Sequence, residues 1–586
     1  AALLDLPAER ILEAMEEAMT AGLVGEVAGA VDHFMFSHAL VRNAIYGRLS
    51  RSRRVRLHLR VGGALEQAAG SGGAAGPGEL AHHFFLAREL GGAAKAVRYA
   101  VQAGDEAARS LAYEEAAAHY RRALEAFDLG DERDEAARCD ILLTLGRVQW
   151  QAGDAAARET YFEAADSAGR RGAARQLAYA ALGLGERYWE AGAVDPQYQQ
   201  LLARALDELG PEDSKPRSHV MARMAENLHF TAPEQGVELS LEALDMARRI
   251  GGVDTLVTAL MGRHVALLHI EHLDKRLRLI DEVLGLAQGH PALAAEAHHW
   301  RLFDLCELGD LTEAHRDHAE LTALAHTLRQ PLLQHLAVGW EGAFAHLAGD
   351  VEAAERLAGR SAEFAKQAEV WHATSSLASM LFTLRRQQGR IYELLPAMQS
   401  LAGGESATLA WSAALALAEV ETGAVEEGRA RYAKLAGPDF AAIPRDWYWS
   451  GTAAVLAETC AALGDVERAP RLYALLEPFA ERSIQIIFTA CWGSIHRYLG
   501  LLAGVMDRFD VAERHFEAAL LANARMGALL MTAETQCAYG ALLLRRGLPG
   551  DAERAADLGL LAHRVSAPRG LDGLRARAEL LMAARA

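Results

Sequence analysis

Residues 461–476 read Ala-Ala-Leu-Gly-Asp-Val-Glu-Arg-Ala-Pro-Arg-Leu-Tyr-Ala-Leu-Leu, and this stretch decides the fold. Gly464 is followed, at offsets of five, four and three residues, by Ala469, Tyr473 and Leu476. A glycine just past a helix end takes the left-handed cap conformation at low cost, and the aspartate after it can cap the next helix. The offsets of four and three place the other residues on one helical stripe. The stretch therefore predicts a helical hairpin in which a small residue and a ring face the partner helix.

The same pattern recurs along the chain with a period near 40 residues. Gly153 and Gly192 are 39 residues apart, and Gly309 follows Gly192 after 117 residues, which is three times 39. The later turns fall at intervals of 40, 40, 34, 41, 43 and 43 residues, at Gly349, Gly389, Gly423, Gly464, Asp507 and Gly550. In several repeats a second glycine precedes the turn by seven residues, as Gly146, Gly185, Gly342 and Gly500 do. Seven residues are two helical turns, so we expect this glycine to permit close packing within each hairpin.

At this point the chain resembles the tetratricopeptide-repeat family, over roughly Glu79 to Ala586. The resemblance implies an all-α superhelical solenoid in which each hairpin contacts mainly its neighbours. A period near 40 exceeds the usual 34 residues, so longer helices are expected. Trp150, Trp189, Trp300 and Trp340 precede turn glycines in repeating register, which predicts that they belong to the hairpin core.

Composition limits the possible functions. The 586 residues are 51% hydrophobic and 24% charged, with a formal net charge of −18. Phosphate binding needs clustered Lys and Arg, so we expect no direct nucleic-acid binding through the average surface, although a local basic patch could still bind. The charge-free stretch Ser406–Ala418 has 13 residues, too few to span a bilayer as a helix, so we expect no membrane association. None of the five lysines follows a glycine, which excludes a Walker A phosphate loop. Five scattered cysteines, without a CxxC pair, and no signal-peptide layout favour a reduced, cytoplasmic compartment.

The N-terminal part follows another pattern. Pro7–Ala21 predicts an amphipathic helix, Val31–Phe36 a short strand and Ser37–Ala69 further helix. Ala69–Gly78 reads AGSGGAAGPG and predicts a linker. We therefore expect a winged-helix-like segment over 1–68, a Gly/Ala linker over 69–78 and the repeat array over 79–586.

A second resemblance begins in that segment. Residues 34–42, Phe-Met-Phe-Ser-His-Ala-Leu-Val-Arg, with Arg54 and His58 after them, resemble the segment that joins the ATPase core to the repeats in bacterial STAND/AAA-type signal-transduction ATPases. That group includes regulators of the LuxR type and multidomain adenylate/guanylate cyclases. The stretches Pro444–Trp449, Ala461–Asp465, Gly493–Gly500 and Arg546–Asp551 are similar to its C-terminal repeats.

This resemblance implies that His38 touches the phosphates of a nucleotide held by an ATPase domain, with Arg42 one helical turn later on the same face. The alternative is that His38 caps the helix and Arg42 pairs with a nearby acid. The run of six arginines from Arg48 to Arg60 is open to two interpretations, DNA binding or docking on an acidic neighbouring domain, and sparse base-reading residues favour docking.

Two further groups could bind something. The histidines between His264 and His346 include His315 and His318, which are three residues apart and could bind one metal ion. The HExxH motif is missing, so ordinary surface and packing roles are favoured for these histidines. Trp447 and Trp449 break the register of the other tryptophans and, two residues apart, point to different sides of a helix. We expect both rings at an accessible rim that contacts another domain or an effector; the alternative is that both are core.

The sequence thus leaves two main hypotheses. The first is the regulatory, sensor and scaffold region of a bacterial signalling ATPase, with catalysis and output outside this chain. The alternative is a freestanding adaptor that binds a peptide or protein in its concave groove. We expect no enzyme activity, no catalytic residues, no metal and no cofactor of its own, ATP or ADP acting only through an ATPase domain elsewhere.

Overall fold

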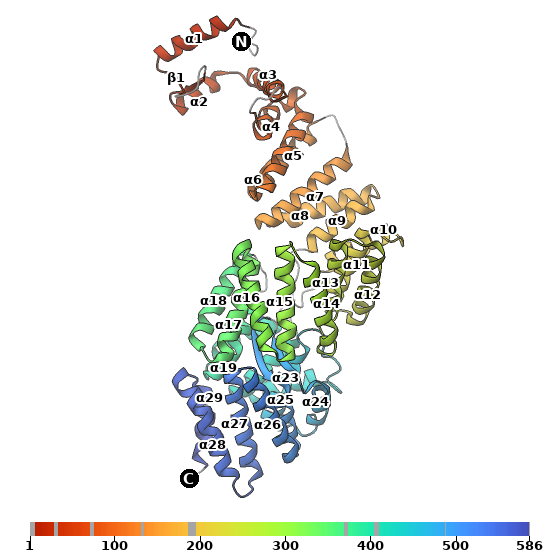
Figure 1. Cartoon of the computed structure of the whole chain (residues 1–586), viewed down its shortest axis with the longest axis vertical. Helices are drawn as coiled ribbons and strands as arrows, with labels where there is room; N and C mark the ends of the chain where they lie inside the picture. Colours follow the sequence, from red (N-terminus) through yellow and green to blue (C-terminus); the bar gives the residue numbers. More distant parts are fainter. Residues whose placement is uncertain are drawn as a thin grey trace. The chain divides into compact units, whose positions relative to one another are not determined.

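The computed structural model describes residues 6–27, 33–70, 75–130, 134–185, 195–368, 373–403, 409–486 and 488–584. The chain forms two compact units (Figure 1), and each is described by itself. Unit 1 comprises Ala1–Tyr188 with Asp207–Leu209, and unit 2 comprises Trp189–Leu206 with Gly210–Ala586. Trp189, Gly192, residues 31–32 of the expected strand and residues 71–74 of the expected linker lie outside the described residues.

Unit 1 begins with a short helix, a two-stranded hairpin and two further helices. The hairpin is antiparallel and pairs Val24 with Phe36 and Glu26 with Phe34. The elements are α1 (Ala8–Thr20), β1 (Val24–Glu26), β2 (Phe34–Phe36), α2 (Ala39–Arg48) and α3 (Arg51–Gly70), followed by α4 (Pro77–Leu86), η1 (Arg88–Leu90), α5 (Ala93–Arg109), α6 (Tyr113–Asp128), α7 (Glu135–Ala152), α8 (Ala157–Arg170) and α9 (Ala174–Gly185). The sequence interpretation found the second strand but missed the first.

At the boundary between the N-terminal segment and the repeats, helix α3 packs against helix α4. α3 runs to Gly70 and α4 begins at Pro77, so both ends of the expected linker are helical. Leu80 and Phe84 of α4 are buried, and Leu59 of α3 packs against the same cluster. A Cβ on Gly62 would lie 3.1 Å from the ring of Phe84, so this glycine lets α3 approach α4 closely.

Unit 2 continues as helical hairpins. Its elements are α10 (Pro196–Leu209, shared with unit 1 at its end), α11 (Lys215–Leu228), α12 (Pro233–Ile250), α13 (Val253–Ala266), η2 (Ile270–His272), α14 (Leu273–Leu286), α15 (Pro291–Leu308), α16 (Leu311–Leu328), α17 (Pro331–Ala348), α18 (Val351–Gln367), α19 (Ala373–Gln387), η3 (Ile391–Leu394), α20 (Leu395–Gly403), α21 (Leu409–Glu421), α22 (Val425–Ala436), α23 (Trp449–Leu463), α24 (Ala469–Leu476), η4 (Glu477–Phe479), β3 (Ser483–Ile486), β4 (Ala490–Ser494), α25 (Ile495–Val505), α26 (Phe509–Arg525), α27 (Leu529–Arg546), α28 (Asp551–Ser566), η5 (Ala567–Arg569) and α29 (Asp572–Ala583). The all-α repeat fold is therefore confirmed.

The repeat period holds even where no glycine marks it. Between Gly192 and Gly309 the 39-residue step predicts turns near 231 and 270. The chain turns there between α11 and α12 and, through η2, between α13 and α14. The turn residues expected from glycine have left-handed backbone, with φ of 86° at Gly349 and 63° at Gly464, and Asp507 takes φ of 55° in the same role.

The packing between small residues and rings is also confirmed. Tyr161 and Phe516 are buried, with 4% and 1% of their surface exposed. A Cβ on Gly146 would lie 3.0 Å from the ring of Tyr161, and one on Gly500 would lie 2.8 Å from the ring of Phe516. The glycine seven residues before the turn therefore makes room for the ring of the second helix.

One element departs from the helical pattern. After η4, the chain forms the antiparallel hairpin β3–β4, which pairs Ser483 with Ser494 and Ile486 with Ala490. Every residue of β3 is buried, and four of the five residues of β4 are buried. In Figure 1 its strands lie in the middle of unit 2, among the helices α15, α23 and α25. The sequence interpretation did not predict this hairpin.

Unit 2 also joins repeats that are far apart in sequence. The Arg569 Nε–H donates to the Gly349 carbonyl at 2.9 Å, and Arg482 lies 2.9 Å from the Asp274 carboxylate. The Ser483 hydroxyl donates to the Cys306 carbonyl. Most contacts in unit 2 join neighbouring helices, as expected, but the hairpin and the last repeats also pack against helices α14, α15 and α17.

Two glycine variants test this long-range packing. Gly464→Ala forces a left-handed alanine into open space and should cost about 1 kcal/mol of unfolding free energy. In Gly349→Ala the new Cβ would also lie 2.8 Å from Arg569 Nε, so it disturbs the long-range hydrogen bond and should cost about 1 kcal/mol more.

Urea unfolding of the full chain measures both losses. In an Arg569→Ala background the excess cost of Gly349→Ala should disappear, because the contact is already gone. Equal losses for the two glycine variants in the parent chain would show that Gly349 acts only as a local cap.

Candidate functional site

One hollow in the described part of unit 2 is lined by aromatic rings. It is partly open to solvent, and its cavity volume is about 50 Å³. Helix α19 contributes Ser379 and Phe382, α21 contributes Trp411 and α23 contributes Thr452 and Val455. Tyr448 stands just before α23, and the hairpin adds Ile486 and Trp492. No residue of this lining carries a charge.

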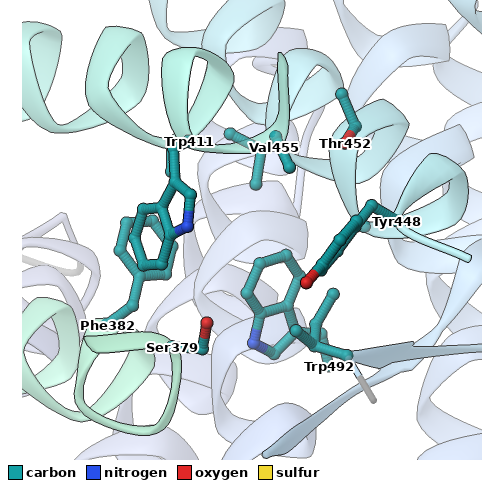
Figure 2. A pocket seen from close by; sticks show the side chains of 11 residues that line it. Ser379, Phe382, Trp411, Tyr448, Thr452, Val455 and Trp492 are labelled. Carbon is teal, nitrogen blue, oxygen red and sulfur yellow. The ribbon is translucent and has the colours of Figure 1, made fainter. Parts of the chain in front are cut away.

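Figure 2 shows how the side chains surround the space. Trp411 and Phe382 lie on one side, and Tyr448 and Trp492 lie on the other. Val455 lies above the space in this view and Ser379 below it. The hairpin is therefore needed to complete the wall, since the helices alone supply only one part of it.

Polar contacts with two helices fix the hairpin in place. The Trp492 indole N–H donates to the Thr383 hydroxyl at 2.6 Å, and its ring lies 5.8 Å from that of Phe382. The Ser494 backbone N–H donates to Asn523 Oδ1 at 3.0 Å. Because a buried edge strand must satisfy its polar groups, these contacts hold β4 against α19 and α26.

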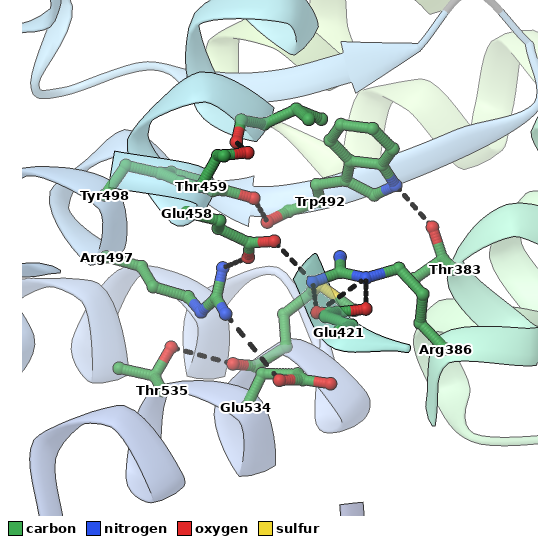
Figure 3. A network of polar contacts seen from close by, with 12 residues as sticks. Thr383, Arg386, Glu421, Glu458, Thr459, Trp492, Arg497, Tyr498, Glu534 and Thr535 are labelled. Carbon is green, nitrogen blue, oxygen red and sulfur yellow. Dashed lines mark hydrogen bonds and ion pairs between the residues drawn. The ribbon is translucent and has the colours of Figure 1, made fainter. Parts of the chain in front are cut away.

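Beside the hollow runs a line of alternating arginines and glutamates (Figure 3), which we call the charge ladder. Its members stand on the first helices of successive hairpins: Arg386 (α19), Glu421 (α21), Glu458 (α23), Arg497 (α25), Glu534 (α27) and Arg577 (α29). Arg386 Nη2 lies 2.6 Å from both Glu421 Oε1 and Glu458 Oε2. Arg497 pairs with Glu458 and lies 3.6 Å from Glu534 Oε2. Arg577 Nη2 ends the line 2.8 Å from Glu534 Oε1.

The ladder is electrically balanced, with three cations and three anions. Burial by itself raises the pKa of Glu458, but the charges of Arg386 and Arg497 outweigh it and lower the pKa to about 2. The pKa of Glu534 is also lowered, because Arg577 and Arg497 outweigh burial. Glu458 and Glu534 therefore stay ionised at neutral pH, and the formal charges of the six ladder residues cancel.

The expectation of exposed rings at Trp447 and Trp449 is wrong. Only 5% of Trp447 and 4% of Trp449 is exposed. Trp447 stacks on Trp300 with ring centroids 6.0 Å apart, whereas Trp449 meets Phe479 at 5.5 Å. The two rings do point to different sides, but each side is core. A contact of these residues with a partner stays a prediction.

The segment around Trp447 instead joins α23 to early repeats of the same unit. The Trp447 backbone N–H donates to His229 Nε2 at 3.2 Å, and Arg445 lies 3.1 Å from the Glu271 carboxylate. Burial lowers the pKa of His229 to about 3, so its ring stays neutral and can accept this bond. The physical reason for the correction is that the repeats close on themselves and cover the predicted rim.

The histidine cluster is largely occupied by packing contacts. His299 accepts from the Trp340 indole N–H at 3.1 Å, and His318 lies 2.9 Å from the Ala337 carbonyl. His315 packs its ring 4.3 Å from that of Phe344. Trp300 and Trp340 are buried core residues, as predicted, whereas Trp150 is half-buried. Among the described residues, no group of three or more His, Cys, Asp or Glu is arranged to hold a metal ion.

In unit 1, His38 and Arg42 are both exposed. His38 Nδ1 accepts from the Leu40 backbone N–H at 3.3 Å, so this histidine caps α2. Arg42 Nη2 donates to the Asn43 amide oxygen at 3.2 Å, where an acidic partner had been considered. These contacts leave the nucleotide-sensing role of the pair as a prediction.

The described helices include none that is long and apolar enough to cross a bilayer. No protein-family model matches the chain, and comparison with curated proteins gives no match.

Several solved structures align with most of the chain at low identity. A structure of the APC/C hetero-tetramer Cut9–Hcn1 aligns with 92% of this chain and 99% of its own, at 15% identity and a TM-score of 0.47. Yeast Tom70 aligns with 84% of this chain and 96% of its own, at 12% identity and a TM-score of 0.25. Naa15/Naa10 bound to HypK-THB aligns with 93% of this chain and 96% of its own, at 11% identity and a TM-score of 0.19. Because the identities and TM-scores are this low, the comparisons carry no argument about function.

Two arginine variants test how much the charge ladder contributes to stability. Arg497→Gln leaves buried glutamates short of a cation and should cost roughly 3–5 kcal/mol of unfolding free energy. Arg429→Gln removes an exposed arginine that lies 3.8 Å from Glu426, and should cost less than about 0.5 kcal/mol.

Urea unfolding followed by tryptophan fluorescence measures both variants. Equal, small losses for the two substitutions would show that the ladder contributes no more than surface ion pairs do.

Proposed function

We propose that the chain is a helical-repeat interaction scaffold in which unit 2 binds a partner polypeptide at the aromatic hollow. The observation that carries the proposal is an accessible, uncharged wall of four rings from three successive hairpins and a buried β-hairpin. Large rings at a concave site are typical binding anchors, because they bury much apolar area with little loss of side-chain entropy.

A non-catalytic role is part of this proposal. The hollow's polar groups are the hydroxyls of Ser379, Thr452 and Tyr448, together with the indole nitrogens of its two tryptophans. Burial raises the pKa of Tyr448, so its hydroxyl stays protonated at neutral pH. A nucleophile needs a base within hydrogen-bond reach, and the lining contains no carboxylate, histidine or lysine.

The finer proposal is that this scaffold is the regulatory region of a bacterial signalling ATPase, coupling partner or effector binding to an ATPase or output domain outside residues 1–586. The stretch from Phe34 to Arg42 favours it, because an adaptor does not need that segment. The alternative, a freestanding adaptor for a peptide or protein, fits the hollow equally well. The reading frame separates them: a Walker A sequence encoded upstream of Ala1 supports the ATPase context, and an in-frame stop there rules it out.

Selection of displayed random peptides on the immobilised full chain tests the scaffold itself. We expect enriched peptides that bind the chain in solution with Kd values in the micromolar range, as is usual for a small anchored interface. Heat-unfolded chain is the control. Failure to enrich any peptide beyond that control, with the native chain shown to be folded on the support, would contradict the proposal.

A further inference from the structure

We infer that the aromatic hollow receives one uncharged ring that carries a hydrogen-bonding atom, the side chain of a tyrosine or tryptophan in a partner polypeptide. This inference rests on the proposed function and names the chemistry of the anchor. It follows from the size, the charge and the unused hydroxyls of the hollow.

Size and openness favour a single anchored side chain. The cavity volume is about 50 Å³, far below that of a site that buries a drug-sized ligand. The rings of Phe382 and Trp411 border the space on one side, and those of Tyr448 and Trp492 border it on the other (Figure 2). Aromatic rings gain energy from offset or edge contacts beyond the area they bury.

Charge excludes an ionised anchor. The lining has no charged side chain, and two residues of the balanced ladder follow lining residues on the same helices. On α19 the ladder residue Arg386 follows Phe382 by one helical turn, with its guanidinium 5.3 Å from the ring centroid. On α23 Glu458 follows Val455 by three residues, and both of its oxygens are engaged by arginines. A Lys or Glu side chain in the hollow would therefore lose hydration without gaining a partner.

Two hydroxyls favour a ring with a polar atom. Ser379 and Thr452 line the hollow from different helices, and no side-chain hydrogen bond joins either hydroxyl to another described residue. Each can donate or accept, so they suit a phenol hydroxyl or an indole N–H. A phenylalanine ring would fill the same space but would leave these hydroxyls unpaired.

The first test uses N-acetyl amides of tyrosine, tryptophan, phenylalanine and alanine, titrated into the full chain and followed by saturation-transfer NMR. We expect Kd values in the millimolar range for the tyrosine and tryptophan amides, weaker binding of the phenylalanine amide and no binding of the alanine amide. Ala414→Leu fills the hollow from α21 and should weaken the tyrosine amide at least about tenfold. Ala430→Leu, on the exposed face of α22 in the same hairpin, is the control and should change nothing.

Thr452→Val keeps the side-chain volume and removes a hydroxyl, which guards against a packing artefact of Ala414→Leu. It should weaken the tyrosine amide by about threefold to tenfold and leave the phenylalanine amide unchanged. Equal binding of all four amides, or binding that Ala414→Leu leaves intact, overturns the inference. So does binding of free indole and p-cresol by a chain that rejects both amino-acid amides, because that result points to a free small molecule.

The peptide selection separates this inference from the function on which it rests. A Tyr or Trp enriched at one peptide position, with binding lost in Ala414→Leu and kept in Ala430→Leu, supports both. Peptides that bind without such a residue and ignore Ala414→Leu leave the scaffold standing and overturn the anchor. A chain that binds the amides but no peptide contradicts the proposed function and, with it, a polypeptide source for the ring.

Discussion

The buried hairpin β3–β4 is the constraint on which unit 2 depends. A two-stranded hairpin exposes backbone polar groups at its edges, and burying them without partners would cost several kcal/mol. Here the Ser483 hydroxyl bonds the Cys306 carbonyl, and Asn523 accepts the Ser494 N–H. Close approach is equally necessary: a Cβ on Gly339 would lie 2.6 Å from the Phe488 ring, and one on Gly451 would lie 2.2 Å from Ile486. Repeats far apart in sequence thus share one core.

The hollow and the charge ladder lie next to each other, because residues of both stand on helices α19 and α23. On α19 and α23 the residues that line the hollow come one turn before the residue that joins the ladder. Trp492 belongs to the wall of the hollow, bonds Thr383 and, through its carbonyl, accepts from the Tyr498 hydroxyl at 3.2 Å beside Arg497. Trp492 therefore connects the wall of the hollow to side chains next to the ladder.

Periodicity was enough to predict the hairpins, because each turn needs left-handed backbone and each ring needs a small residue opposite, as at Gly500 and Phe516. The chain also turns near 231 and 270, one and two 39-residue steps after Gly192, where glycine is missing. The closure of unit 2 was not predictable in that way, since it depends on contacts across hundreds of residues, and it is why Trp447 is core. Two sequence features could have indicated the rest. The uncharged run from Ser483 to Ser494, rich in β-branched and aromatic residues, is typical of buried strands. The ladder positions hold one Arg or Glu per repeat, at a spacing near the repeat period.

Native-state hydrogen exchange of the backbone amides tests the closure of unit 2 most directly. If the hairpin holds distant repeats in one core, amides of Gln485 and Cys491 should exchange only when unit 2 unfolds as a whole. Their exchange free energies should then equal those of the central amides of α15 and α27, and should fall with urea at the same slope. Exchange of the hairpin amides at a much lower free energy, with α15 and α27 still protected, would show that the hairpin opens alone and that the repeats are stable without it.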